Sequence, residues 1–169
     1  PRDDPLPIVL LHGTSASLHT WEGWAEALRG QRRVIRMDLP GFALTSPNPE
    51  NDYSIERYVA SVAALADQLG VQRFVLGGNS LGGQMAGATA VGHPQRGASL
   101  VLVDASGYAF ESAKTPIDVP IGFQMARIKP LAPLVENTLP RGLVEKSVKA
   151  VYGDPSKVTP PLVDLYYDI

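Results

Sequence analysis

One short motif constrains the backbone of this sequence more than any other feature. It is a serine flanked by glycines, and it lies between an apolar run and a segment with helical character. Residues 78–82 read Gly-Asn-Ser-Leu-Gly, directly after the apolar run 73–77 and directly before a stretch with helical character. A serine at a sharp strand-to-helix turn exposes its Oγ, and the flanking backbones approach so closely that glycine is needed two positions away on each side. We therefore predict a strand, a strained turn and a helix, with Ser80 as a nucleophile.

Apolar runs and helical segments alternate along the first hundred residues. Each predicted strand is a short apolar run that ends at a polar or glycine-containing turn: 7–11, 33–37, 73–77 and 99–103. The predicted helices lie between these runs: 20–28, 54–69 and 81–91. This alternation predicts an α/β fold, a doubly wound and mostly parallel sheet with helices on both faces.

The character of the chain changes after Asp104. Eight prolines separate short amphipathic stretches there, without a strand-like run. This pattern predicts helices rather than further sheet, so we divide the chain into a core, 1–106, and a helical cap, 107–169. Four apolar residues of the cap could line a substrate pocket or, equally well, pack the cap on the sheet: Tyr108, Phe110, Phe123 and Met125.

The composition excludes several classes of function. A net charge of −2 offers no basic surface for nucleic acid or an anionic membrane, and the absence of cysteine excludes disulfides and thiol chemistry. No apolar run is long enough to span a bilayer, and residues 1–5 read as neither a signal peptide nor a transit peptide. Motifs for metals and nucleotides are also missing. We therefore expect a small-molecule substrate and no metal or other cofactor; the compartment is open, with the cytoplasm favoured.

Three turns carry a resemblance to a known family. His-Gly at 12–13 follows the first strand, Asp-Leu-Pro-Gly at 38–41 follows the second, and the serine corner follows the third. With these motifs the chain resembles the α/β-hydrolase family, in particular its esterase, lipase and carbon–carbon hydrolase branch with a helical cap. The resemblance is close over 7–104 and implies that the four strands are the family's third to sixth. A serine at the corner argues against the related haloalkane dehalogenases and epoxide hydrolases, which place aspartate there.

Two backbone amides are candidates for an oxyanion hole. When a serine attacks a carbonyl, the carbonyl oxygen becomes negative and needs fixed hydrogen-bond donors. The Leu81 N–H lies in the first turn of the predicted helix, where backbone donors have no helical partner. The resemblance implies the Thr14 N–H as the second donor.

None of the three histidines fits the role of catalytic base. The resemblance implies the order serine, acid, histidine, and only His93 follows Ser80. His93 ends the predicted helix, roughly 18 Å from Ser80 at 1.5 Å per residue, which excludes it. The resemblance gives His12 a structural role beside the oxyanion hole, and His19 stands before Ser80, out of order.

Asp104 is the candidate for the acid of the triad within this chain. It ends the fourth strand, where functional residues of open α/β sheets gather. By resemblance, a minority of the family takes its acid from this strand and the majority from the next, and a hydrogen-bonding role in the loop or cap is the alternative for Asp104. Asp38 is expected to pin its own Pro-Gly turn. Because no base is present, we expect the chain to be part of a longer hydrolase with a partial α/β-hydrolase fold.

These observations predict a cofactor-independent serine hydrolase that cleaves a carboxylic ester or a similar small, largely apolar carbonyl substrate through an acyl-enzyme. A carbon–carbon hydrolase of ring-fission products is the first alternative, and a perhydrolase is the second. The same fold also serves ligand receptors with little or no turnover, which is an alternative of another class. Trp21 and Trp24, three residues apart, are expected to pack the first helix on the sheet.

Overall fold

The computed structural model describes residues 3–107 and 140–168. The chain divides into two compact units, Pro1–Ala109 and Phe110–Ile169. The four predicted pocket residues, Tyr108, Phe110, Phe123 and Met125, lie outside the described residues. The role of the second unit as a cap stays a prediction.

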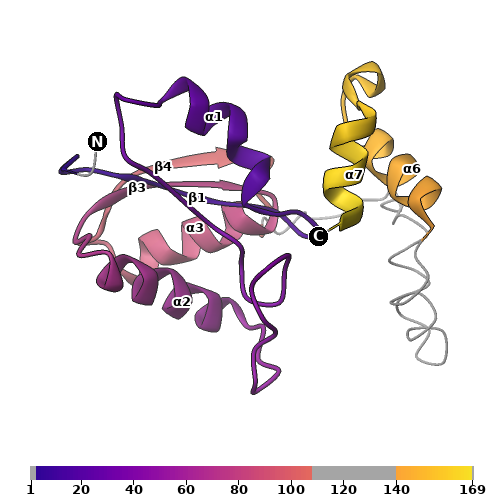
Figure 1. Ribbon diagram of the computed structural model, residues 1–169. Coiled ribbons are helices and arrows are strands. Elements are labelled where there is room, and N and C mark those ends of the chain that lie inside the picture. The colour runs from indigo at the N-terminus through magenta and orange to yellow at the C-terminus, as the bar shows by residue number, and fades with distance from the viewer. Residues whose placement is uncertain (1–2, 108–139, 169) are drawn as a thin grey trace. The chain divides into compact units, whose positions relative to one another are not determined.

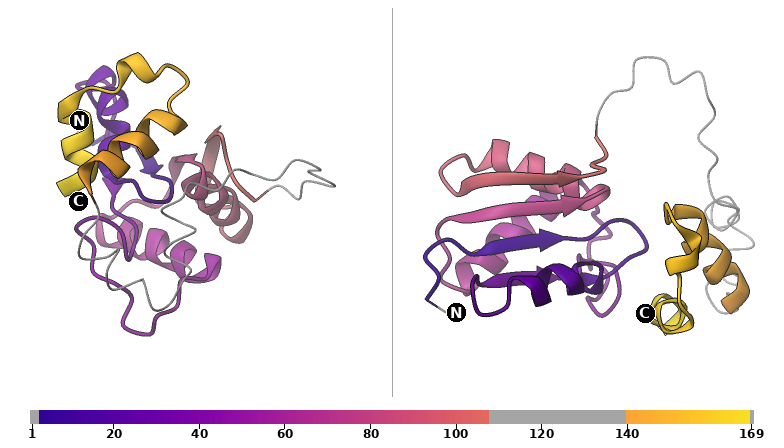
Figure 2. Two further views of the ribbon diagram at one scale, coloured as in Figure 1. Left: turned by 90° about the vertical axis from the view of Figure 1, so that its right-hand side faces the viewer. Right: turned by 90° about the horizontal axis from the view of Figure 1, so that it is seen from above.

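A parallel sheet forms the centre of the first unit. Its four strands are β1 (Ile8–Leu11), β2 (Val34–Met37), β3 (Phe74–Asn79) and β4 (Gly97–Val103). They lie in the order β2-β1-β3-β4, and every neighbouring pair is parallel (Figure 2). Their carboxyl ends therefore meet at one edge of the sheet, where the turns singled out in the sequence come together.

Helices cover both faces of this sheet, which confirms the predicted α/β fold. The connecting elements are a 3₁₀ turn, η1 (Leu18–Trp21), and the helices α1 (Glu22–Ala27), α2 (Ile55–Gln68) and α3 (Leu81–Gly92). Figure 1 shows α1 on one face of the sheet and both α2 and α3 on the other. As predicted, Ser54 begins α2: its Oγ accepts a hydrogen bond from the Arg57 N–H at 3.3 Å.

Three element boundaries differ from the prediction by two residues, whereas the other differences are of one residue. The segment predicted as one helix, 20–28, begins earlier as a 3₁₀ turn, because the Ser17 hydroxyl accepts the His19 N–H and starts the turn there. β3 continues to Asn79, since its pairing with β4 continues as far as Asn79 opposite Val103. β4 begins at Gly97 rather than at residue 99.

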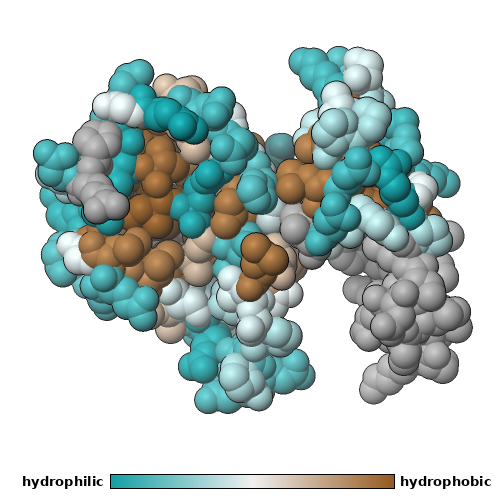
Figure 3. Space-filling model, in the orientation of Figure 1, coloured by the Kyte–Doolittle hydropathy of each residue, from teal (hydrophilic) through white to brown (hydrophobic). Residues whose placement is uncertain are grey.

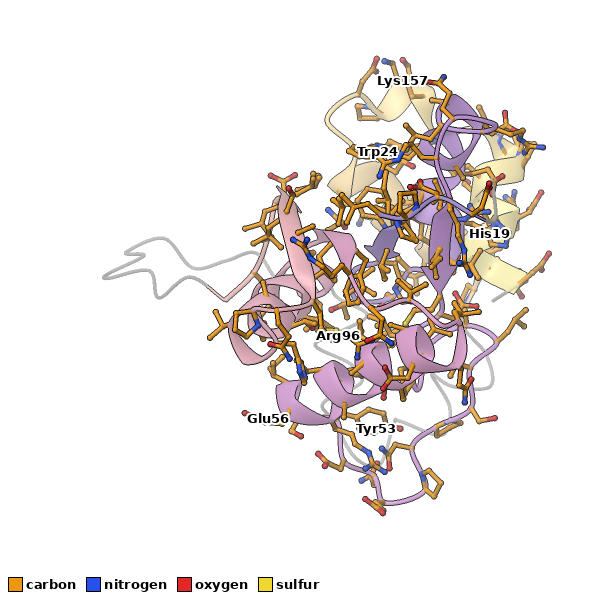
Figure 4. All side chains as sticks on the ribbon, turned by 90° about the vertical axis from the view of Figure 1, so that its left-hand side faces the viewer. His19, Trp24, Tyr53, Glu56, Arg96 and Lys157 are labelled. Carbon is orange, nitrogen blue, oxygen red and sulfur yellow. The ribbon has the colours of Figure 1, made fainter. Side chains whose placement is uncertain are left out.

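The prediction for the two tryptophans is half wrong. Trp21 is 3% exposed and packs with Ile8 and Leu10 of β1. Trp24, labelled in Figure 4, is 42% exposed. Its ring packs against the Trp21 ring in a T-shaped arrangement, with 5.3 Å between the centroids. Of the two tryptophans, only Trp21 therefore packs on the sheet.

Each face of the sheet has its own hydrophobic cluster. Side chains alternate along a strand, so Val9 and Leu11 of β1 belong to the cluster that includes residues of α2 and α3. Ile8 and Leu10 belong to the cluster of Trp21 on the opposite face. Burial on both faces explains why β1 is apolar without interruption.

Apolar residues also reach the surface of the first unit on the face that Figure 3 turns toward the viewer. In the described sheet β4 has a neighbour on one side only. Two leucines of β4 are strongly exposed, Leu100 at 41% and Leu102 at 48%.

The described part of the second unit is helical, with α6 (Arg141–Val151), a 3₁₀ turn η2 (Pro155–Lys157) and α7 (Pro160–Asp168). A small cluster of valines joins α6 to α7, and Arg141 bonds to the carboxylate of Asp164 at 2.6 Å. No helix in residues 3–107 or 140–168 has the length and apolar character to cross a membrane.

Candidate active site

Ser80 forms the corner between β3 and α3 in a strained backbone conformation, with φ 51° and ψ −119°. Residues other than glycine rarely adopt a positive φ, and such conformations persist only where the surroundings enforce them. The Ser80 N–H donates to the Val103 carbonyl at the end of β4 at 3.0 Å, and the Ser80 carbonyl accepts the Ser106 N–H at 3.0 Å. The corner is therefore fastened to the chain on either side of Asp104.

The two glycines of the corner are required by backbone contacts, as the sequence suggested. A Cβ on Gly78 would lie 2.2 Å from the Gly82 carbonyl oxygen. A Cβ on Gly82 would lie 2.3 Å from the Leu11 carbonyl oxygen at the end of β1. Backbone atoms cannot rotate aside as a side chain can, so β1, β3 and α3 meet at this distance only with glycine at both positions.

The first candidate oxyanion donor, the Leu81 N–H, follows Ser80 directly. Leu81 is the first residue of α3, and the N–H groups of Gly83 and Gln84 donate to the Ser80 carbonyl at 3.0 and 3.1 Å. The Leu81 N–H lies two residues before these donors and has no acceptor within the helix. The role of the Leu81 and Thr14 N–H groups as donors to an oxyanion stays a prediction.

Gly13 brings the second donor next to the corner. A Cβ on Gly13 would lie 3.1 Å from the Cβ of Ser80 and 3.0 Å from the Oδ1 of Asn79. Thr14, the next residue, is exposed. The Asn79 side chain also donates to the Val103 carbonyl at 3.2 Å, so it links the corner to the end of β4.

His12 is buried and both of its ring nitrogens are engaged. Nδ1 donates to the Gly13 carbonyl at 2.7 Å, and Nε2 accepts the Leu39 N–H at 3.0 Å. Burial lowers the pKa of His12, and this effect outweighs the opposite influences of the Gly13 carbonyl and of the Asp38 carboxylate. A neutral ring with both nitrogens bonded to backbone is structural, in agreement with the role that the resemblance gave it.

The other two histidines have different surroundings. His93 follows the last residue of α3, and the twelve residues of that helix place it roughly 18 Å from Ser80. His19 lies on η1, with Nδ1 3.6 Å from the Glu22 carboxylate (Figure 4). Glu22 also accepts a hydrogen bond from Arg36 at 2.7 Å, which holds the pKa of that carboxyl below its usual value.

Asp104 follows β4 directly and has a φ of 45°. Its side chain is exposed, and its backbone neighbour Val103 is the residue that binds the N–H of Ser80. The structure thus places Asp104 beside the corner, and its role as triad acid stays a prediction.

The expectation for Asp38 is wrong. Its Oδ1 accepts the Leu18 N–H at 2.7 Å, so the carboxylate binds the loop after β1 and not its own Pro-Gly turn. The turn is held instead by the Thr45 hydroxyl, which donates to the Asp38 carbonyl at 2.8 Å. The contact follows from the parallel register, in which Leu11 pairs with Met37 and the next residues of both strands come together, and no local sequence pattern indicates it.

The described residues give little sign of other chemistry. Within 3–107 and 140–168, no three His, Cys, Asp or Glu side chains are grouped to hold a metal ion. A surface cavity of about 390 Å³ lies among residues that precede strands, including Pro7, Arg33 and Arg73. It is therefore at the amino edge of the sheet, whereas Ser80 lies at the carboxyl edge.

This chain is similar in sequence to known hydrolases. The family model described as alpha/beta hydrolase fold matches residues 7–143. The 2-hydroxy-6-oxo-2,4-heptadienoate hydrolase of Pseudomonas putida is 38% identical over 108 residues, which cover 62% of this chain and 39% of that protein. The pimeloyl-[acyl-carrier protein] methyl ester esterase of Aeromonas hydrophila is 38% identical over 99 residues, covering 59% and 37%.

A solved structure has the same arrangement of elements. The meta-cleavage product hydrolase of Pseudomonas fluorescens IP01 superposes with a TM-score of 0.75 at 27% identity. The match covers 98% of this chain and 56% of that structure. The chain thus spans less than half of the two curated relatives and about half of the solved one.

Proposed function

The chain belongs to the α/β-hydrolase fold family, and from this premise we propose that it carries the nucleophile and the oxyanion hole of a serine hydrolase. Ser80 Oγ attacks a carbonyl carbon, and the N–H groups of Leu81 and Thr14 bind the oxygen as it becomes negative. The leaving group departs with a proton, and water then hydrolyses the acyl-enzyme. The strongest support for this proposal is the positive φ of Ser80, at a turn where close backbone contacts require glycine at positions 78 and 82. Such strain is common at active sites.

The proposed mechanism requires a base that the described histidines do not supply. His12 has both ring nitrogens bonded, and His93 lies at the far end of α3. His19 precedes Ser80 in the chain, outside the order serine, acid, histidine that the resemblance implies. We therefore place the base in another part of the full-length protein. The acid that orients it is then either Asp104 or a residue of that same part.

The preferred reaction is hydrolysis of a carboxylic ester of a small, largely apolar compound. The similarity to a methyl ester esterase supports it. The similarity to a 2-hydroxy-6-oxo-2,4-heptadienoate hydrolase supports carbon–carbon bond cleavage as the second candidate. Both reactions begin with the same attack on a carbonyl carbon, so they share the proposed roles of Ser80, Leu81 and Thr14 and differ in the leaving atom.

The test uses the full-length protein with p-nitrophenyl butyrate and, in parallel, 2-hydroxy-6-oxo-2,4-heptadienoate. Ser80→Ala is expected to lower kcat by orders of magnitude on whichever substrate is turned over. Ser61→Ala is the control, because this serine lies on α2 and its hydroxyl donates to the Arg57 carbonyl. Turnover that survives in Ser80→Ala would remove the mechanism. A protein that binds these compounds without turning them over would be a receptor instead.

A further inference from the structure

The loop that connects β1 to η1 is held at both ends by two consecutive residues that follow β2. We call residues 12–18 the Thr14 loop. At its start, the Leu39 N–H donates to Nε2 of His12 at 3.0 Å. At its end, the Leu18 N–H donates to Oδ1 of Asp38 at 2.7 Å. His12 and Leu39 are fully buried, so the first contact lies inside the protein; Asp38 is 7% exposed, and its contact with Leu18 is partly buried.

From this arrangement we propose that Asp38 and His12 are positioning residues, which set the place and direction of the Thr14 N–H. The inference rests on the proposed function, since it concerns the oxyanion hole of that mechanism. The Gly13 carbonyl and the Thr14 N–H belong to one planar peptide group, in which they point in opposite directions. Because Nδ1 of His12 donates to this carbonyl at 2.7 Å, it also fixes the direction of the N–H.

The Thr14 loop needs such restraints because its backbone is strained. Ser15 has a φ of 54°, which a residue with a side chain adopts only at a cost. A strained loop keeps its conformation when its surroundings enforce it. A hydrogen bond from a backbone N–H to a carboxylate is stronger than one to a neutral oxygen, so the bond between Leu18 and Asp38 is suited to this task.

The distance between the Thr14 loop and the nucleophile explains why its position matters. A Cβ on Gly13 would lie 3.1 Å from the Cβ of Ser80, so the loop is already in contact with the corner. A displacement of about 1 Å in a catalytic arrangement can lower a rate by about 100-fold. The contacts of Asp38 and His12 therefore act on the reaction through Thr14, without touching the substrate.

The first experiment compares three variants of the full-length protein by kcat, KM and thermal unfolding. Asp38→Ala removes the acceptor of the Leu18 N–H, whereas Asp38→Asn keeps an oxygen at that place. Asp52→Ala is the matched control, because Asp52 also accepts a backbone N–H, that of Ser54 at 2.9 Å, in front of α2. We expect Asp38→Ala to lower kcat by about 10- to 100-fold with little change in KM, and Asp38→Asn to recover most of it. The kcat of Asp52→Ala should match the wild type.

The second experiment tests the other end of the loop with two variants of similar size. In His12→Asn, the side-chain N–H₂ takes the place of Nδ1 and still donates to the Gly13 carbonyl. In His12→Gln, the side-chain oxygen takes the place of Nε2 and still accepts the Leu39 N–H. Both lose the packing of the ring, but His12→Asn is expected to keep at least about fivefold more of the kcat than His12→Gln. This pair decides the proposal if Asp38→Ala does not fold.

Failure of this inference can be told apart from failure of the proposed function. If Ser80→Ala keeps full turnover, the function itself is wrong. If Ser80→Ala is inactive and the kcat of Asp38→Ala equals that of Asp52→Ala, the proposed function stands and the positioning role of Asp38 is wrong. Equal kcat values in His12→Asn and His12→Gln also overturn it. A direct structural readout needs no turnover: nitrogen NMR of His12 should show the proton on Nδ1, and a proton on Nε2 contradicts the proposal.

Discussion

Substitution of Gly78 by alanine tests the geometry on which the active site depends. In the native backbone the new Cβ would lie 2.2 Å from the carbonyl oxygen of Gly82, 2.3 Å from its carbonyl carbon and 2.6 Å from the Gly83 nitrogen. Ordinary contacts between such atoms begin near 3.4 Å, so β3 and the first turn of α3 must separate by about 1 Å. This displacement carries Leu81 with it, because Leu81 is the first residue of that turn.

The expected effect is large for both stability and catalysis. Overpacking of this kind costs about 1–3 kcal/mol of folding free energy, and more where the obstacle is backbone. A shift of about 1 Å at the nucleophile and its oxyanion donor lowers kcat by about 100-fold. Urea unfolding and steady-state kinetics of Gly78→Ala in the full-length protein measure the two effects separately.

Gly87 supplies a control within the same helix. It lies in the interior of α3, and a Cβ there would meet nothing within 4 Å. Gly87→Ala should therefore stabilise the protein by about 0.5–1 kcal/mol, through the lower conformational entropy of alanine in the unfolded chain, with unchanged kcat. If Gly78→Ala matches the wild type in both unfolding and kcat, the close approach of β3 and α3 is not a requirement and the reasoning fails.

Two further predictions concern stability. The Arg96 side chain, labelled in Figure 4, is 11% exposed; it donates a hydrogen bond to the Val71 carbonyl at 2.8 Å and forms an ion pair with Asp67 at 2.8 Å. We expect Arg96→Ala to lower the free energy of unfolding in urea by about 1–3 kcal/mol. Arg96→Lys should recover only part of this loss, because an ammonium group lacks the planar set of N–H donors of a guanidinium. A full recovery with lysine would contradict this. Burial lowers the pKa of His12, so below about pH 6.5 the unfolded chain takes up a proton that the folded one excludes, and stability should fall as the pH drops from 7.5 to 5. The fall should be smaller in His12→Gln, and an identical pH dependence would refute this assignment.

The sequence was sufficient to predict those features for which the local backbone or burial allows only one type of residue. Glycine at 78 and 82, with serine between them, implied the corner because the backbones approach too closely for any side chain. The unbroken apolar run of β1 implied a strand covered on both faces, and the structure confirms it. These features depend on neighbours in the chain or on burial alone.

Features that depend on the register between strands could not be predicted from the sequence. Asp38 bonds to Leu18, twenty residues away, because β1 and β2 pair with Leu11 opposite Met37. No local pattern specifies that register. Similarly, the spacing of Trp21 and Trp24 fits one helical face, but Trp21 ends a 3₁₀ turn and Trp24 lies in α1, so only one ring is buried.

The helices α6 and α7 pack together around a hydrophobic cluster of the second unit. Val144, Val148, Val158 and Val163 form a cluster whose members all come from the second unit, whereas the clusters of the sheet draw on residues of the first. A mutation among these valines is therefore expected to weaken the packing between α6 and α7.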